Sequence, residues 1–372
     1  MSVTSSSKNS FIQNLLRPHL RDFTPYASAR RTMSGGNLWL NANESPYGRP
    51  YRVETEELNR YPDFQNRALN QAYAEYAGLH RDQVISHRGS DESIELVIRT
   101  FCEPGRDKIL ICPPTYGMYG ISAAINHNET VAIPLRADDW QLDLPAIEAA
   151  LAQSDNPIKV VFLCNPSNPL GNALREEDML SVIERCRGKA LVVVDEAYIE
   201  FVADPARTSM VRYLEQFENL LVMRTLSKAF GLAGIRVGFS LASPNMVQAL
   251  LPVLAPYPLP DVSVQIARQA LTLDQLIATR QNTFEVVSER TRLMNSLQEL
   301  PWVQKVYPSV TNFILLQVTD ANALMAHCQA EGVLIRNQSS QLGLTHCVRI
   351  TVGSPEENER LLEVLAAFRD NA

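Results

Sequence analysis

Three apolar runs, separated by segments of helix length, constrain the fold of this chain more than any other feature. They are IKVVFLC at 158–164, ALVVV at 190–194 and NLLVM at 219–223. Strands that are apolar at almost every position are buried on both faces, as in parallel sheets whose crossover connections are helices. The sequence therefore predicts an α/β fold in which a mostly parallel sheet is sandwiched by helices.

Each of these runs leads into polar side chains that suit a catalytic site. Asn168 follows the first run, Asp195 and Tyr198 follow the second, and Lys228 follows the third. Because ligands bind beyond the carboxyl ends of parallel strands, we expect these four residues to lie along one edge of the sheet. A single aspartate at a strand end is commonly a helix cap, whereas several chemically matched groups indicate a site.

The segment TLSKAFGLAGIRVG at 225–238 joins a lysine to groups that bind phosphate. Thr225 and Ser227 precede Lys228, and Arg236 follows it in the same segment. Lysine condenses with aldehydes, while hydroxyls and arginine donate hydrogen bonds to phosphate. Lys228 taken alone would be read as an exposed lysine at the start of a helix. The segment as a whole suits pyridoxal phosphate, an aldehyde that carries a phosphate.

Residues 89–101 predict a helix whose N-terminus suits the same phosphate. Their apolar residues recur with the spacing of one buried helix face. Ser90 is a good N-cap residue, and Asp91 in the first turn suits the helix dipole. Capping alone would explain this pattern. Free N–H groups at a helix start also bind phosphate, so the motif by itself leaves both interpretations open.

Three tyrosines are candidates for contact with a ligand. Tyr116 follows the strand-like run at 108–113 and would either stack on a flat ring at the mouth of a cleft or pack in the core. Tyr26 belongs to an N-terminal stretch rich in aromatic residues, which usually packs on its own chain or on a partner. Tyr61 precedes a proline in the turn NRYPD at 59–63 and is held extended.

The C-terminal part predicts a smaller α+β lobe. Strand-like runs occur at 312–318, 333–338 and 347–353, and the last two carry Arg336 and Arg349. An arginine buried without a partner is costly, and its planar fork suits carboxylate or phosphate. The period-two pattern of the last run also allows Arg349 to point to water.

The 372 residues are too many for one small core, so we expect two lobes and an arm. An N-terminal arm, 1–45, is predicted to join the small domain. The large cofactor-binding domain is predicted at 46–255 and the small C-terminal domain at 256–372.

Charge and composition exclude several classes of function. The net charge of −7, without a basic block, offers no attraction to nucleic acid or to an anionic membrane. No apolar run is long enough to span a membrane, and the polar first ten residues lack a signal-peptide core. The cysteines show no CxxC spacing and mostly lie in apolar runs, which favours a reducing, cytoplasmic location.

Motifs of other chemistries are missing from the sequence. It contains no GxxxxGK[ST], no GxGxxG after a strand, no GxSxG and no HExxH. The histidines show no metal-ligand spacing, so no metal site is expected.

The order of motifs from about Tyr26 to Gly353 resembles the histidinol-phosphate aminotransferases, a branch of the fold type I pyridoxal-phosphate enzymes. The lysine segment is shared by many relatives of this superfamily, whereas LNANESPYG, NRYPD and the pair Arg336/Arg349 narrow the resemblance to this branch. The motifs, in chain order, are LNANESPYG, NRYPD, GSDE, PTYGMY, NPSNPLG, DEAY, TLSKAFGLAGIRVG and RITVG. One departure is Leu170, where the family usually carries threonine; it removes a hydroxyl near Asn168.

The chemistry of pyridoxal phosphate assigns a role to most of the candidate residues. Lys228 would bond to the cofactor aldehyde and later move the substrate proton. Asp195 would keep the ring nitrogen protonated, while Tyr198 and Asn168 would hydrogen-bond the ring hydroxyl. Tyr116 would stack on the ring. The phosphate would be held by the side chains of Thr225, Ser227 and Arg236 and by the backbone of Ser90 and Asp91.

The resemblance implies a homodimer with its sites at the interface. Tyr61 would then reach the cofactor phosphate of the partner subunit. Arg336 and Arg349, helped by Tyr26, would bind the phosphate of one substrate or the carboxylate of the other.

The resemblance also implies a reaction of histidine biosynthesis. In it, histidinol phosphate and 2-oxoglutarate are interconverted with imidazole acetol phosphate and glutamate by transfer of an amino group. Two alternatives stay open: an aromatic amino-acid aminotransferase of the same branch, and a pyridoxal-phosphate lyase that decarboxylates a phosphorylated amino acid. A non-catalytic cofactor-binding module attached to a DNA-binding region is disfavoured, because the short N-terminus has no room for a helix-turn-helix.

Overall fold

The computed structural model describes residues 11–27, 31, 33, 35–152 and 156–369. Its larger sheet has the strand order β2-β8-β7-β6-β5-β3-β4, and β8 runs antiparallel to both of its neighbours while the other strands are mutually parallel. This confirms the predicted mostly parallel sheet. The strands are β2 (Val84–His87), β3 (Lys108–Ile111), β4 (Glu129–Ala132), β5 (Ile158–Cys164), β6 (Leu191–Asp195), β7 (Leu220–Thr225) and β8 (Gly238–Ala242).

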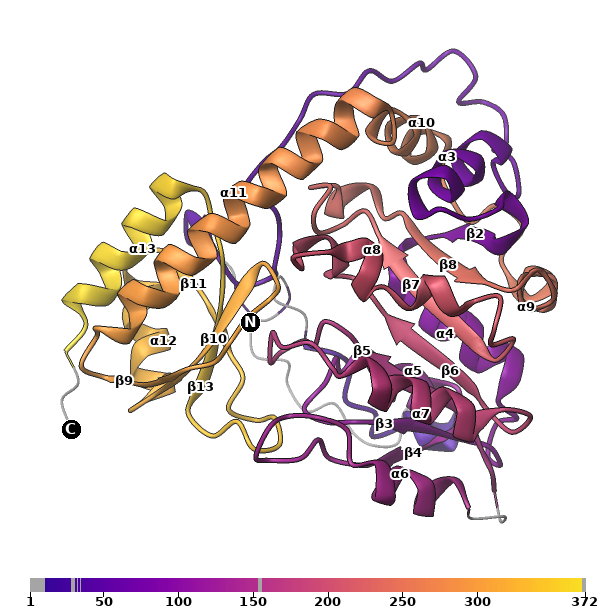
Figure 1. The fold of residues 1–372 in the computed structure, drawn as a ribbon, viewed down its shortest axis with the longest axis horizontal. Coiled ribbons are helices and arrows are strands. Elements are labelled where there is room, and N and C mark those ends of the chain that lie inside the picture. The colour runs from indigo at the N-terminus through magenta and orange to yellow at the C-terminus, as the bar shows by residue number, and fades with distance from the viewer. Residues whose placement is uncertain (1–10, 28–30, 32, 34, 153–155, 370–372) are drawn as a thin grey trace.

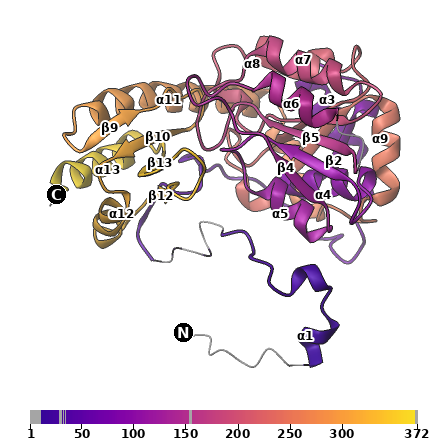
Figure 2. The same cartoon turned by 90° about the horizontal axis from the view of Figure 1, so that it is seen from below.

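Helices cover both faces of this sheet, with α6, α7 and α8 on one face and α4 and α5 on the other (Figure 2). Alternate residues of β5 follow this division, because Val160 and Phe162 pack in one apolar cluster and Val161 and Leu163 in the other. The strand is therefore apolar on both faces, as its sequence requires. The helices are α3 (Arg67–Ala77), α4 (Gly89–Phe101), α5 (Met118–Ile125), α6 (Leu144–Leu151), α7 (Glu176–Cys186), α8 (Pro205–Thr208), α9 (Pro244–Leu250) and α10 (Asp261–Ala270).

A smaller antiparallel sheet of order β12-β13-β10-β9 forms the second lobe. The long helix α11 (Leu273–Gln298) runs from the large sheet to this lobe (Figure 1). The other elements of the lobe are β9 (Val303–Val306), β10 (Phe313–Val318), α12 (Ala321–Ala330), β12 (Arg336–Asn337), β13 (Cys347–Thr351) and α13 (Pro355–Ala367).

The N-terminal segment reaches this smaller lobe through one short strand. β1 (Leu38–Trp39) pairs in parallel with β11 (Val333–Leu334). The run at 333–338, expected as one strand, is therefore divided, because β11 pairs with β1 while β12 joins the other sheet. The start of the predicted arm, residues 1–10, lies outside the described residues, and α1 (Phe11–Leu15) follows it.

No helix within the described ranges is both long and apolar enough to cross a membrane. All six cysteines are described, and each is a buried free thiol.

Candidate active site

The carboxyl ends of β5, β6 and β7 lie side by side, and the polar residues that follow them lie at this edge. In register, Cys164 of β5 is opposite Asp195 of β6, which is opposite Met223 of β7. Tyr198 follows β6 and lies with its ring 5.8 Å from Lys228 Nζ. This edge of the sheet is where ligands bind in α/β proteins.

Lys228 follows β7 and is partly buried at this edge of the sheet. Its Nζ donates a hydrogen bond to the backbone carbonyl of Ala42, 3.0 Å away. Burial and, to a lesser extent, the positive charge of Arg349 lower the pKa of Lys228 to about 8. Because the neutral amine is the form that attacks a carbonyl, this lysine reacts at a lower pH than an exposed one.

Asp195 is a buried carboxylate at the end of β6. Its side chain is 4% exposed, and burial raises its pKa to about 6. Tyr119 OH donates to Oδ2 at 2.7 Å, and the Ala197 backbone N–H donates to Oδ1 at 3.1 Å. No Lys, Arg or His in the described part of the chain is within ion-pair distance of it. Such a carboxylate is suited to a cation brought by a ligand.

Two functional contacts of this site were not predicted from the sequence. Asn43 Nδ2 donates to Tyr198 OH at 2.9 Å, and Tyr119 donates to Asp195 as described above. Both residues lie inside motifs, LNANESPYG and PTYGMY, that the sequence singled out. Their partners are far along the chain, so only the motifs themselves could have drawn attention to them.

Hydroxyls and an arginine form a cradle beside the start of α4. Thr225 Oγ1 lies 2.9 Å from Ser227 Oγ, and Arg236 Nη1 donates to Ser227 Oγ at 3.4 Å. Arg236 has a φ of 54°, a left-handed conformation that is uncommon for a residue with a side chain. Gly89 has a φ of 72°, a left-handed conformation that favours glycine, and a Cβ there would lie only 2.6 Å from Arg236 Nη2 and displace its guanidinium. Polar donors and a helix N-terminus thus converge, as a phosphate site requires.

The prediction that Ser90 caps α4 is wrong. The helix begins at Gly89, its N-cap is Arg88, and Ser90 lies inside the first turn. The Glu92 carboxylate accepts the Arg88 backbone N–H at 2.5 Å. A carboxylate inside the helix thus accepts the N-cap backbone N–H, and no capping hydroxyl is present.

Asp91 links the cradle to the aromatic side chains above it. Its Oδ2 lies 3.3 Å from Arg236 Nη2, and its Oδ1 accepts a hydrogen bond from Tyr116 OH at 2.9 Å. Tyr26 packs edge-on against Tyr116, with the ring centroids 5.9 Å apart. The arm therefore brings Tyr26 to the same site.

Arg336 and Arg349 are direct register partners on β12 and β13. Arg349 is buried and donates to Asn168 Oδ1 at 2.5 Å and to the Asn41 carbonyl at 3.0 Å, while its Nε has no partner among the described residues. Burial lowers its pKa. Arg336 donates to the Ala27 carbonyl. The alternative in which Arg349 points to water is therefore wrong, because every residue of β13 is buried.

Among the described residues, Tyr61 and Leu170 do not offer polar contacts to the candidate site. Tyr61 is 80% exposed and stacks on Tyr257 at 4.4 Å, and it has no hydrogen bond or ring contact with the other candidate residues described here. Leu170 packs, at 1% exposure, in an apolar cluster to which both lobes contribute. The site therefore contains Asn168 without a hydroxyl from position 170.

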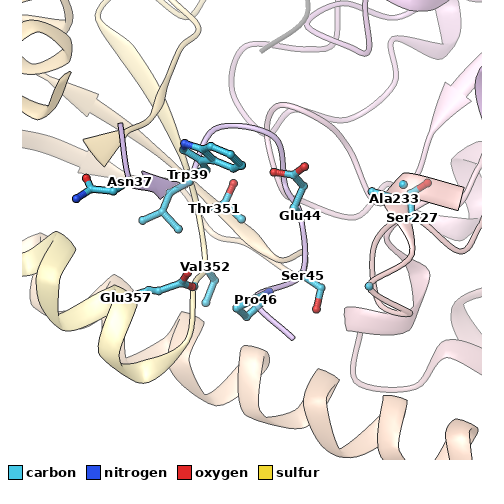
Figure 3. A pocket seen from close by; sticks show the side chains of 14 residues that line it. Asn37, Trp39, Glu44, Ser45, Pro46, Ser227, Ala233, Thr351, Val352 and Glu357 are labelled. Carbon is cyan, nitrogen blue, oxygen red and sulfur yellow. The ribbon is translucent and has the colours of Figure 1, made fainter. Parts of the chain in front are cut away.

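A cavity of about 380 Å³ adjoins the cradle. Glu44 and Ser45 of the N-terminal segment line one side, Ser227 and Ala233 line another, and Thr351 comes from β13 (Figure 3). Its walls are contributed by both lobes and by the segment that joins them. Its volume is in the range of pockets that take small ligands, which is about 300–1,000 Å³.

Comparison with known proteins identifies the family of this chain. Residues 37–365 match the family described as aminotransferase class I and II. The chain belongs to this family. Within it, the chain is 52% identical over 96% of its length, and 99% of the relative's, to the histidinol-phosphate aminotransferase 2 of Idiomarina loihiensis. The resemblance to the histidinol-phosphate aminotransferase branch is thus confirmed.

Solved structures confirm the fold. The histidinol-phosphate aminotransferase of Sinorhizobium meliloti in complex with pyridoxal-5'-phosphate superposes with a TM-score of 0.82, at 23% identity, covering 97% of this chain and 98% of that one. The L-threonine-O-3-phosphate decarboxylase of Porphyromonas gingivalis gives 0.70 at 19% identity, covering 88% and 98%. The fold alone therefore does not separate transamination from decarboxylation.

Enzymes of this family depend on pyridoxal 5'-phosphate, and the residues present fit that cofactor. Asp195 offers a buried carboxylate that no cation of the described ranges pairs with, which suits a protonated ring nitrogen. Ser227 and Arg236 offer donors for the phosphate. Lys228 offers an amine with a pKa of about 8 for the aldehyde.

Proposed function

We propose that this enzyme transfers an amino group between histidinol phosphate and 2-oxoglutarate, giving imidazole acetol phosphate and glutamate. The observation that carries the proposal is the buried guanidinium of Arg349. Its Nε has no hydrogen-bond partner within the described part of the chain, and it lies close enough to Lys228 to lower the pKa of that lysine. Such a group beside a reactive amine suits a substrate with an anionic end. The name of the relative from Idiomarina loihiensis supports a phosphate on one substrate.

When bound, pyridoxal phosphate supplies a ring that accepts the electron pair of the bond broken at the substrate Cα. Lys228 would hold the cofactor through its aldehyde carbon and, once displaced by the substrate amine, would act as the base that moves the Cα proton. Asp195 would keep the ring nitrogen protonated. Tyr198, oriented by Asn43, and Asn168 would hydrogen-bond the ring hydroxyl.

The remaining residues would hold and orient the ligands. Tyr116 would stack on the ring. The cofactor phosphate would be bound by the side chains of Thr225, Ser227 and Arg236 and by the backbone of Ser90 and Asp91. Arg336, Arg349 and Tyr26 would bind the anionic end of either substrate. In this proposal residues 46–255 form the cofactor domain, and residues 1–45 and 256–372 supply the substrate arginines and the arm.

The direct test is incubation of the purified enzyme with histidinol phosphate and 2-oxoglutarate. We expect stoichiometric formation of glutamate and poor use of histidinol without its phosphate. Release of carbon dioxide from a phosphorylated amino acid, without glutamate, would instead identify a decarboxylase. Equal turnover of phenylalanine and histidinol phosphate would refute the specific substrate and support only the assignment to the aminotransferases.

An Arg349→Ala variant is expected to raise KM for both substrates by about tenfold or more, because each charge-assisted contact is worth about 1.5–3 kcal/mol. The absorption spectrum of the bound cofactor should stay unchanged. Steady-state kinetics with each substrate varied in turn measures the effect. Arg360→Ala, on the exposed face of α13 with an ion pair to Glu331, is the matched control and should keep both constants. An unchanged KM in Arg349→Ala would remove this arginine from the substrate site.

We further propose that the active unit is a homodimer. Leu273, Ile277 and Phe284 lie on one face of α11 by their spacing and are 72%, 49% and 76% exposed. Tyr61 and Tyr257, which stack on each other and are exposed, add aromatic surface. Large apolar groups gathered in this way indicate an interface.

The buried free thiols support a location in the cytoplasm.

Sedimentation of the parent enzyme should give the mass of two chains, and Phe284→Glu should shift it towards one chain with loss of activity, because a charge would be buried in the interface. Tyr61→Phe should remain dimeric and bind cofactor more weakly. The exposed substitution Arg207→Glu, on α8, is the control for an added charge. A fully active single chain would refute the dimer.

A further inference from the structure

Tyr119 is a fully buried tyrosine whose hydroxyl donates a hydrogen bond to Asp195 and also lies beside the Cys164 thiol. It is the second residue of α5, it is 0% exposed, and its OH lies 2.7 Å from Asp195 Oδ2. Its ring stacks on Phe162 of β5, with centroids 4.8 Å apart and planes 7° apart. It also meets Tyr116 edge-on at 5.6 Å. These ring contacts hold the aromatic ring in place and so keep its hydroxyl next to Asp195.

The other ionisable groups around Asp195 do not stabilise its charge. Asp91 on α4 and Glu196, next along the chain, are acidic and raise the pKa of Asp195. Cys164 of β5 has a pKa raised by burial to about 12, and burial also raises the pKa of Tyr198, so both are neutral. The hydrogen bonds that oppose burial come from Tyr119 and from the Ala197 N–H.

We propose that Tyr119 is a positioning residue for Asp195, whose hydroxyl keeps the carboxylate ionised and turned so that it can receive the cofactor's ring nitrogen. A neutral tyrosine can only donate to an ionised carboxylate oxygen, so the bond favours the charged form. Burial raises the pKa of Tyr119 itself well above its ordinary value, which keeps it a donor at working pH. The inference rests on the proposed function, because it assumes that Asp195 faces the cofactor.

The test is a Tyr119→Phe variant, which deletes the hydroxyl and keeps the ring on Phe162. In the full chain before cofactor is added, carbon-13 NMR of labelled aspartate, assigned by comparison with Asp195→Asn, should show the pKa of Asp195 rising from about 6 by about one to two units. In the loaded enzyme, kcat near pH 7 should fall about tenfold while KM for both substrates changes less than about twofold. The acidic limb of the kcat profile should move to higher pH.

The matched control is Tyr73→Phe. Tyr73 is equally buried and stacks on Phe239 at 3.6 Å, and it lies on α3, away from Asp195. Its loss of a hydroxyl should leave the pKa of Asp195 within about 0.3 unit. Replacing Tyr119 by 3-fluorotyrosine, a stronger donor of the same shape, should move the pKa of Asp195 downward. This second variant keeps the test decisive if the phenylalanine variant folds poorly.

An unchanged pKa of Asp195 and an unchanged acidic limb in Tyr119→Phe would overturn the proposal and leave Tyr119 a packing residue. That failure is distinct from a failure of the proposed function, because the parent enzyme would still transaminate. Conversely, the expected shift in the cofactor-free chain would support the hydrogen bond even if histidinol phosphate were not the substrate.

Discussion

A Lys228→Ala variant is expected to lose covalent attachment of the cofactor and at least about 10³-fold in rate, since it removes both the carrier amine and the base. Borohydride reduction followed by mass spectrometry of the peptides should fix pyridoxal phosphate to residue 228 in the parent and nowhere in the variant. Lys189→Ala, which removes a lysine from the exposed turn after α7, should retain full labelling. Labelling of another lysine in the parent would refute the assignment.

The lowered pKa of Lys228 adds a pH signature to the same experiment. The amine must be neutral to attack an aldehyde, and its pKa of about 8 means that the neutral form grows as pH rises to 8 and then saturates. Attachment of cofactor to the cofactor-free chain should therefore accelerate about tenfold per pH unit below 8 and level off above it. An ordinary lysine would continue to accelerate to about pH 10. Stopped-flow absorbance distinguishes the two profiles.

An Asp195→Asn variant is expected to lose about a hundredfold or more in kcat, equivalent to roughly 3 kcal/mol in the barrier. Asparagine keeps the shape of the side chain and cannot hold the ring nitrogen protonated. Cofactor should still attach to Lys228, so borohydride labelling measures folding and loading independently of rate. Asp204→Asn, which retains the capping contact at the start of α8, is the control. Near-normal turnover in Asp195→Asn would show that the carboxylate has another role.

The main elements of the fold followed from patterns that are local in the sequence. The run at 158–164 is apolar at almost every position because β5 is covered on both sides, and that requirement alone predicts a parallel sheet. The placement of Asn168, Asp195 and Lys228 at one edge followed in turn, because parallel strands end on the same side.

Local detail was predicted less well where two segments compete for the same contact. Ser90 has the chemistry of a cap, yet Glu92 satisfies the backbone N–H of Arg88 and the helix starts one residue earlier than Ser90. The run at 333–338 looks continuous, and its division into β11 and β12 depends on β1, a strand almost three hundred residues away. Neither outcome is encoded in the pattern of the segment itself.

The sequence by itself determined which residue types reach the sheet edge, because periodicity and strand ends are properties of neighbouring residues. The tertiary structure decided which of them meet. Arg349 meets Asn168, Asn43 meets Tyr198, and Tyr119 meets Asp195, across 181, 155 and 76 residues of chain. The first contact depends on how the two lobes pack, the second on where the N-terminal segment lies, and the third on how α5 packs on the large sheet. Burial then gives Lys228 and Asp195 their shifted pKa values. The local sequence does not show how distant segments pack. The same side chain can fill a core, cap a helix or take part in catalysis, depending on the residues that it contacts in the folded chain.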